Sequence, residues 1–347
     1  MRNRLTIALD ATYAVGEQLS GVGLYSREIL LGLAAAHPEA RFLFCYRPHR
    51  YLRSWSQALP PNARRRLLFE PVVPRRAALF HGLNQRLPQV HLPRAVATFH
   101  DLFVMTGEYS TPEFRARFAA QARGAAARAT AVIAVSAFTA RQVVALLGVP
   151  ESKVRVIHHG LRHLAYPANA PRQKIILNVG AIQKRKNIAR LVEAFETVDP
   201  SWRLVLAGAS GYGSAEILAS IARSPARGRI STPGYVAPAD LAAWYAGAQI
   251  FAFPSLDEGF GMPVLEAMAA GTPVVASRSS ALPEVAGEAA ILVDAEDTAA
   301  LAEALRGLTA NDDLKGDLAR RGLARAHLFT WEKAVRETWD VYRELLG

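Results

Sequence analysis

Short apolar runs alternate with longer amphipathic segments along the whole chain. The apolar runs have the length of buried strands and occur at residues 5–9, 42–46, 95–99, 132–135, 154–157, 175–179, 203–207, 250–253, 273–276 and 291–293. The segments between them have helical length, as at residues 22–36, 112–128, 138–147, 187–197, 239–246 and 298–309. Strands that alternate with helices predict parallel sheets with helices packed on both faces.

The strand series restarts near residue 175, after a segment at residues 162–171 that is rich in proline and alanine. A chain of 347 residues is also long for a single domain. We therefore predict two doubly wound α/β domains, at residues 1–166 and 167–330. A last helix at residues 331–347 has no strand after it, and we expect it to cross back to the first domain.

The net charge of +11 is unevenly distributed. Residues 1–166 contain 22 Lys and Arg against 9 Asp and Glu, whereas residues 167–347 contain 19 against 21. Such asymmetry indicates an anionic partner of the first half, which could be a nucleic acid, an anionic membrane or a phosphorylated acceptor. A solvated, arginine-rich surface explains the same pattern equally well.

Cysteine content and hydropathy indicate in which cellular compartment the protein resides. Cys45 is the single cysteine, which excludes an internal disulfide framework and fits a reducing environment. The first apolar run ends at Asp10, and no run approaches the ~18 residues of a membrane span. We expect a cytoplasmic protein and hypothesise that its basic half binds the inner face of the plasma membrane peripherally.

Glycine and histidine follow two of the predicted strands, where ligands bind in doubly wound sheets. Gly21 and Gly23 open a helix after the first strand, so backbone N–H groups there could approach a phosphate. An ordinary tight turn would use the same glycines. His100 follows the run at residues 95–99, and it could serve chemistry or be a structural loop histidine.

Three consecutive cations, Lys184, Arg185 and Lys186, follow Gly180 at a predicted helix start. Cations at a helix N-terminus oppose the helix dipole, unless an anion binds between them. Lysine supplies a point charge and arginine a bidentate fork, and both suit phosphate oxygens. This pattern favours an anion site over a solvated charge cluster.

Two carboxylates lie on either side of a predicted helix start: Glu258 in a glycine-rich turn, and Glu266 one turn inside the helix that Pro263 is predicted to open. Carboxylates accept two hydrogen bonds, so they suit the vicinal diols of a sugar or ribose. The alternative is a salt-bridged loop acid and a helix-surface acid. No Asp and His cluster has metal-ligand spacing, and we interpret residues 311–313 as a loop between helices.

Together these motifs resemble glycosyltransferase family 4, also called glycosyl transferases group 1, a large group of retaining enzymes. The resemblance covers nearly the whole chain and is most specific in VGAIQKRKNIARLVEAF, FAFPSLDEGFGMPVLEAMAAGTPVV and SALPEVAGEAAILV. It implies the GT-B architecture, in which two facing Rossmann-like domains hold the donor site in the cleft.

The resemblance also implies roles for individual residues. Glu258 and His100 are expected near the transferred sugar, and Lys186 on the donor diphosphate. Arg185 would replace an arginine that many members carry where this chain has Ala181. The implied donor-binding residues are Gly21, Gly23, Gly180, Phe260, Gly261, Met262, Val264, Leu265 and Glu266, the last on the ribose.

The implied activity is that of a retaining, metal-independent hexosyltransferase without a cofactor. Its donor would be a nucleotide-sugar, for which we favour GDP-mannose. Its acceptor would be a glycan or a lipid-linked molecule of cell-envelope polysaccharide or glycoconjugate synthesis, and no nucleic acid partner is expected. The alternatives are a sugar-nucleotide epimerase or phosphorylase on the same fold, or a basic binding protein that has lost transfer.

Overall fold

The computed structural model describes residues 4–70, 74, 77–167 and 170–347 of a chain that divides into two compact units. The first unit comprises Met1–Thr106, Thr111–Gly160 and Thr330–Gly347, and the second comprises Gly107–Ser110 and Leu161–Phe329. Apart from Gly107–Ser110, the chain thus first leaves this unit after Gly160, earlier than the predicted boundary at Tyr166, and returns to it at Thr330. Ala168 and Asn169 of the predicted linker lie outside the described residues.

The first unit is built on a parallel sheet of seven strands within the described residues. In spatial order the strands are β3 (Ala63–Leu67), β2 (Arg41–Tyr46), β1 (Thr6–Asp10), β4 (Leu79–Gly82), β5 (Ala95–Phe99), β6 (Ala131–Ala134) and β7 (Val154–Val156). Its helices are η1 (Thr12–Ala14), α1 (Gly21–Ala36), α2 (Pro48–Tyr51), η2 (Leu52–Ser56), α3 (Phe103–Thr106), α4 (Pro112–Arg128), α5 (Ala137–Leu147), η3 (Glu151–Lys153) and α13 (Trp331–Leu346).

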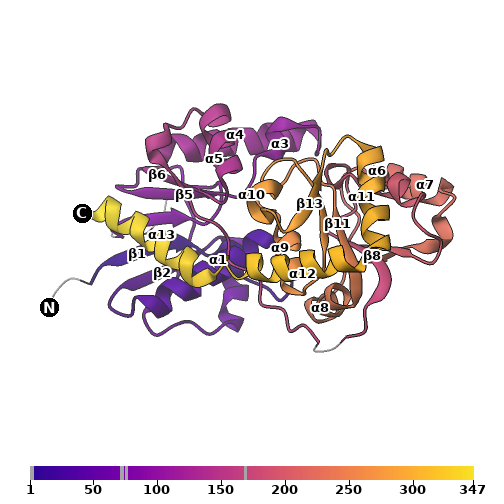
Figure 1. Cartoon of the computed structure of the whole chain (residues 1–347). Helices are drawn as coiled ribbons and strands as arrows, with labels where there is room; N and C mark the ends of the chain where they lie inside the picture. The colour runs from indigo at the N-terminus through magenta and orange to yellow at the C-terminus, as the bar shows by residue number, and fades with distance from the viewer. Residues whose placement is uncertain (1–3, 71–73, 75–76, 168–169) are drawn as a thin grey trace. The chain divides into compact units, whose positions relative to one another are not determined.

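The C-terminal helix α13 belongs to the first unit, where Figure 1 shows it in yellow. It packs on α1 so closely that a Cβ atom at Gly32 would lie 2.4 Å from Val335. The last helix therefore joins the unit that the first strands form, although more than 160 residues of the second unit separate them in sequence.

The second unit has a parallel sheet of six strands within its described residues. In spatial order these are β10 (Ile230–Gly234), β9 (Arg203–Ala207), β8 (Gln173–Val179), β11 (Ala248–Phe253), β12 (Val274–Ser277) and β13 (Ala290–Val293). Its helices are η4 (Lys184–Lys186), α6 (Ile188–Phe195), α7 (Ser214–Arg223), η5 (Arg227–Arg229), α8 (Pro238–Gly247), α9 (Met262–Ala269), α10 (Leu282–Ala286), α11 (Thr298–Ala310) and α12 (Asp312–Ala326).

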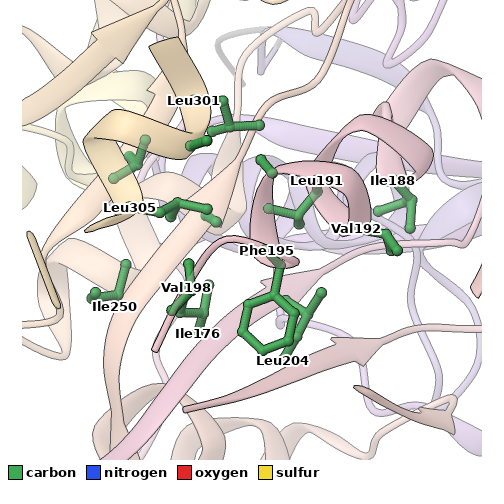
Figure 2. Packing of buried hydrophobic residues seen from close by; sticks show 14 of the residues in the cluster. Ile176, Ile188, Leu191, Val192, Phe195, Val198, Leu204, Ile250, Leu301 and Leu305 are labelled. Carbon is green, nitrogen blue, oxygen red and sulfur yellow. The ribbon is translucent and has the colours of Figure 1, made fainter. Parts of the chain in front are cut away.

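Apolar side chains of α6 and α11 cover one face of this second sheet. Leu191 and Phe195 of α6 and Leu305 of α11 are fully buried against Ile176 and Ile250 of the central strands (Figure 2). Burial of large aliphatic and aromatic side chains contributes ~1.5–3 kcal/mol each. This core fixes the positions of the ends of β8 and β11. It therefore also fixes the starts of the loops that follow these strands.

Both sheets have the doubly wound strand order in which the chain moves outward in one direction and then in the other. The predicted fold class, two doubly wound α/β domains, is confirmed. The reversal falls between β1 and β4 in the first unit and between β8 and β11 in the second. Ligands in such sheets bind beyond the carboxyl ends of the strands at this point. Among the described residues, no helix is long and apolar enough to cross a membrane.

One predicted loop is wrong. Asn311 is not part of an extended loop but the N-cap of α12, and its side chain accepts a hydrogen bond from the Leu314 N–H at 2.9 Å. Asp312 and Asp313 form the first helical turn. Asn at the cap and acids in the first turn are favourable at a helix start, which is the reason for the difference.

Candidate functional site

The loop after β8 carries the three cations. Lys184, Arg185 and Lys186 form the 3-10 turn η4 directly before α6, which begins at Ile188, so they lie at a helix start as predicted. Gly180 at the start of this loop has φ of +146°, and a Cβ atom there would lie 3.1 Å from the Lys186 side chain. A side chain at residue 180 would therefore be strained and would crowd Lys186.

Asn187 fixes the end of η4. It lies in the left-handed region with φ of 58°, which asparagine tolerates better than most residues. Its side-chain amide donates to the Pro254 carbonyl at 3.0 Å and to the Ala295 carbonyl at 2.7 Å. The loop after β8 is thereby attached to the loops after β11 and β13.

Glu258, in the loop after β11, meets two of these cations. Its Oε1 atom lies 2.6 Å from the Lys186 ammonium and 2.9 Å from the Arg185 guanidinium. Arg185 also donates to the Asp257 carbonyl, and Lys186 lies 4.5 Å from the centre of the Phe253 ring. All three charged side chains are buried. The sequence separates these residues by more than seventy positions, and the switch point of the sheet brings them together.

The two cations of this cluster keep Glu258 ionised. Burial by itself raises the pKa of the Glu258 carboxyl, but Lys186 and Arg185 together outweigh burial and lower the pKa to about 2. The adjoining Asp257 is also buried, so the turn after β11 places two acidic residues beside the two cations. Buried cations interact with an anion more strongly than cations in water do.

The glycine-rich turn continues from Glu258 into α9. Gly261 has φ of +107°, and a Cβ atom there would come within 2.6 Å of Leu282, so this position requires glycine. Phe260 is buried edge-on against Phe329 at 5.8 Å. Helix α9 begins at Met262 with Pro263 in its first turn, as predicted, and its next residues, Val264 and Leu265, are buried. The backbone at the start of α9 thus lies directly beyond the Glu258 turn.

Glu266 lies one turn inside α9, and its bonding partners are different from those of Glu258. Its Oε2 atom accepts a hydrogen bond from the Tyr245 hydroxyl at 2.8 Å, and its Oε1 atom lies 3.8 Å from the Arg162 guanidinium. The Tyr166 hydroxyl donates to its backbone carbonyl at 2.9 Å. Burial raises the pKa of Glu266, although Tyr245 and Arg162 oppose the shift. The two carboxylates therefore have different partners and opposite pKa shifts.

In the first unit, Gly21 and Gly23 begin α1 behind Ser20, whose side chain accepts a hydrogen bond from the Gly23 N–H at 3.2 Å. A Cβ atom at Gly23 would lie 2.7 Å from the Tyr13 carbonyl oxygen, so packing within the unit already requires this glycine. A Cβ atom at Gly21 would meet no atom of the described residues within 4 Å. Packing therefore accounts for the glycine at residue 23 but not for the glycine at residue 21.

His100 follows β5 and is buried. Its Nε2–H donates to the Leu83 carbonyl at 3.0 Å, which leaves the lone pair on Nδ1. Among the described residues, Nδ1 has no hydrogen-bond partner. Burial lowers the pKa of His100 to about 4, although the bond to Leu83 opposes the shift. His100 is therefore a neutral hydrogen-bond acceptor near neutral pH.

A buried polar chain lies next to His100. The Tyr25 ring packs edge-on against His100 at 4.7 Å, and the Tyr25 hydroxyl bonds Thr98 at 3.1 Å. Thr98 in turn lies 2.8 Å from His81 Nε2, and His81 Nδ1 lies 2.5 Å from the Tyr342 hydroxyl of α13. The C-terminal helix is thereby connected to the wall of the His100 site.

Sequence reasoning missed several residues of these sites. Tyr245 and Arg162 hold Glu266, Asn187 holds the cation loop, and Tyr25 packs on His100. The only available signal was position, since Asn187 follows the cations directly and Tyr25 follows Gly23 within the same turn of α1. Arg162 and Tyr166 lie in the segment interpreted as a linker.

The structure brings Gly180, Arg185, Lys186, Glu258, the Phe260–Met262 turn and the start of α9 together in the second unit. Gly21, Gly23 and His100 belong to the first unit. No group of three or more His, Cys, Asp or Glu side chains in the described part of the chain could hold a metal ion.

Comparisons with known proteins match both units. A family model described as Glycosyltransferase Family 4 matches residues 20–163, and a model described as Glycosyl transferases group 1 matches residues 173–311. O-antigen chain mannosyltransferase B of Escherichia coli is 29% identical over 378 residues, which covers 96% of this chain and 99% of that protein.

Solved structures share the fold over the whole chain. Sucrose-phosphate synthase from Thermosynechococcus elongatus has a TM-score of 0.75 at 24% identity, with 99% of each chain covered. HepE from Anabaena, in complex with UDP and glucose, has a TM-score of 0.74 at 16% identity, with 98% of this chain and 99% of that chain covered. These GT-B glycosyltransferases confirm the predicted architecture of each unit. Since the two family models match the two units in order and together cover most of the sequence, the chain belongs to glycosyltransferase family 4, the glycosyl transferases group 1, and is a glycosyltransferase.

Proposed function

We propose that the enzyme is a retaining hexosyltransferase that transfers mannose from GDP-mannose to a glycan or lipid-linked acceptor in cell-envelope polysaccharide synthesis. The observation that carries the proposal is the buried cluster of Arg185, Lys186 and Glu258 at the carboxyl ends of β8 and β11. Its two cations suit the diphosphate of a nucleotide-sugar, and its carboxylate suits sugar hydroxyls.

Mannose and polysaccharide synthesis are supported by similarity. The Escherichia coli relative that this chain matches over nearly its full length is named an O-antigen chain mannosyltransferase. A nucleotide-sugar donor is supported by HepE, which shares the fold and is bound to UDP and glucose in its crystal.

The proposed reaction breaks the bond between the sugar C1 atom and the diphosphate oxygen and forms a bond from C1 to an acceptor hydroxyl oxygen. The proton of that hydroxyl passes to the departing diphosphate on the same face of the sugar, so the anomeric configuration is kept. Arg185, Lys186 and the N-terminus of α9 stabilise the negative charge that develops on the leaving group. These groups supply the stabilisation without a metal ion, and Glu258 positions the sugar. Glu266 holds the ribose.

A transfer assay with a set of nucleotide-sugars tests the proposal. Lys186→Ala should lower kcat by about 10²–10³-fold, the loss typical when one charge-stabilising group is removed. Lys184→Ala is the matched control, because Lys184 belongs to the same turn but is exposed. NMR of the product anomeric centre reports retention directly.

The donor is identified first by thermal shift. A nucleotide-sugar at 100-fold its Kd should stabilise the protein by ~2.7 kcal/mol. Normal turnover of Lys186→Ala, or inversion of the anomeric centre, would contradict the proposed mechanism. If UDP-sugars stabilised the protein and GDP-mannose did not, the proposed donor would be wrong.

A further inference from the structure

Residues 47–69 of the first unit form a strongly basic surface, which we call the β3-edge surface. It consists of α2, η2 and the edge strand β3, and it contains six arginines and no Asp or Glu. Of these arginines, Arg50 and Arg53 belong to α2 and η2, and Arg65 packs against η2. Arg64 and Arg66 alternate to the opposite face of β3, and Arg47 lies 3.7 Å from Asp10. This short segment therefore supplies a large part of the charge excess of the first half of the chain.

Large apolar side chains project from the same surface. Leu52 and Trp55 of η2 are 80% and 62% exposed, and Leu67 and Phe69 at the end of β3 are 44% and 56% exposed. Leaving such side chains in water forgoes the free energy of burying them. Exposed apolar groups gathered among cations are typical of a site that meets another phase or molecule.

Arg65 holds η2 against β3. Its guanidinium donates to the Ser54 carbonyl from Nε at 3.1 Å and from Nη2 at 2.9 Å, and it also donates to the Gln57 carbonyl. The same guanidinium packs over the Trp55 ring at 4.9 Å. Trp55 is thus exposed on a braced turn.

An apolar cavity lies beside the end of η2. Its volume is about 180 Å³, and it is lined mainly by Leu30 and Leu31 of α1, Phe44 and Tyr46 of β2 and the segment after η2. Leu31 is itself 44% exposed. The apolar character of the β3-edge surface therefore continues into the adjoining part of the unit.

We propose that the β3-edge surface docks the enzyme on an anionic lipid bilayer. Arginines bind lipid phosphates, tryptophan is favoured at the level of the headgroups, and leucine inserts among the upper acyl carbons. A nucleic acid partner would satisfy the arginines and could stack on Trp55, but it offers no apolar environment for Leu52, the most exposed side chain of the set. The bilayer accounts for both the charge and the aliphatic groups.

Membrane docking extends the proposed function. It depends on that proposal in one respect only, which is that the acceptor is lipid-linked. A lipid-linked acceptor is confined to the membrane surface, so an enzyme held there meets it at a raised local concentration. Membrane binding and donor binding are separate measurements, so one can fail without the other.

Sedimentation of the whole protein with vesicles tests the proposal. Binding to vesicles of neutral lipid with about one-third anionic lipid should exceed binding to neutral vesicles and should fall with salt. The double variant Arg50→Gln, Arg53→Gln should bind about 25-fold more weakly, from a loss of about fivefold for each basic residue. The variant Leu52→Ser, Trp55→Ser should bind at least tenfold more weakly at unchanged charge.

Arg223→Gln, Arg227→Gln is the matched control, because it removes two exposed arginines from the second unit. It should bind vesicles like the wild type, and all variants should keep the thermal shift given by the nucleotide-sugar donor. Equal losses in the control, binding that is independent of anionic lipid, or tight binding to DNA duplexes without vesicle binding would overturn the proposal.

Discussion

At the scale of single residues, the surroundings of Glu258 and Glu266 shift the pKa values of these two buried carboxyls in opposite directions. Burial raises both pKa values, but at Glu258 the adjacent Lys186 and Arg185 outweigh it. At Glu266 the Tyr245 hydroxyl and the more distant Arg162 do not. Glu258 is therefore held ionised by the fold, whereas ionisation of Glu266 costs stability at neutral pH. The separate roles given to the two acids from sequence remain predictions, and this difference in environment supports them.

Replacing Glu258 by glutamine should unbalance its cluster. The amide has nearly the same shape but no charge, so Arg185 and Lys186 would lose the carboxylate that both of them contact. Removing one partner from a buried ion pair costs about 3–5 kcal/mol. A bound diphosphate would replace the missing negative charge. Thermal melting should show Glu258→Gln to be less stable than the wild type but to gain more from GDP.

Glu296→Gln makes the same charge change at an exposed position nearby in the fold of this unit. It should leave both the melting temperature and the gain from GDP unchanged. If Glu258→Gln behaved like this control, the carboxylate would not be balancing the two cations, and the electrostatic account of the site would be wrong.

At the scale of elements, the strands that sequence reasoning missed are those whose patterns depart from an apolar run. Strand β3 reads Ala-Arg-Arg-Arg-Leu, because an edge strand has neighbours on one side only. Strand β10 is the other missed edge strand and contains Pro233, which edge strands tolerate. Strand β4 is central, but it reads Leu-Phe-His-Gly, so a polar residue and a glycine interrupt its apolar run. The buried central strands and the helix that Pro263 opens could be predicted because periodicity and turn residues agree there.

The loop between η4 and α6 depends on Asn187 for both its backbone and its attachments. Alanine at this position should destabilise the second unit by about 4 kcal/mol, from three lost hydrogen bonds of ~1 kcal/mol each, one of them accepted from Arg190, and ~1 kcal/mol of left-handed strain. Glycine should cost about 1 kcal/mol less than alanine, since it has no Cβ atom to strain. Urea denaturation measures both differences.

Transfer activity gives the second measurement at Asn187. Both variants should lower kcat, because η4 carries Arg185 and Lys186 and would lose its connection to the loop after β11. Equal stability of the alanine and glycine variants would contradict the strain term. Full activity in both would show that η4 keeps its position without the asparagine.

At the scale of the whole molecule, the sequence could predict two doubly wound domains because each domain repeats the same alternation of strand and helix. It could not predict the buried polar chain of the first unit. His81 and Tyr342 are 261 positions apart, and they meet only because α13 returns to the first unit. His81 also lies in the short strand β4, whose pattern gave no signal. Side chains that come together from distant elements are specified by topology, which local patterns do not contain.

This distribution of buried histidines predicts that acid unfolds the first unit before the second. Burial lowers the pKa of His81 to about 3 and that of His100 to about 4, from an ordinary value of 6.5. The unfolded chain therefore binds protons more strongly, and stability falls as the pH decreases below 6.5. At pH 5 each of these two histidines costs about 2 kcal/mol, which together is comparable with the lower range of domain stabilities. In the second unit, the corresponding loss from Glu258 begins only below about pH 4.5 and continues to about pH 2, because its pKa is lowered from 4.5.

Hydrogen exchange measured at pH 7 and pH 5, corrected for the intrinsic exchange rates, can show which unit loses stability in acid. Protection should fall at pH 5 in β1, β4 and β5 while β8 and β11 keep theirs, because the two histidines lie in or directly after strands of the first sheet. His81→Gln removes one titrating group. Between pH 7 and pH 5, the free energy of unfolding of this variant should therefore fall by about 2 kcal/mol less than that of the wild type. The variant should be the less stable of the two at pH 7. His91→Gln, at an exposed position, should follow the wild type. Equal loss of protection in both sheets would mean that the buried histidines do not govern acid stability.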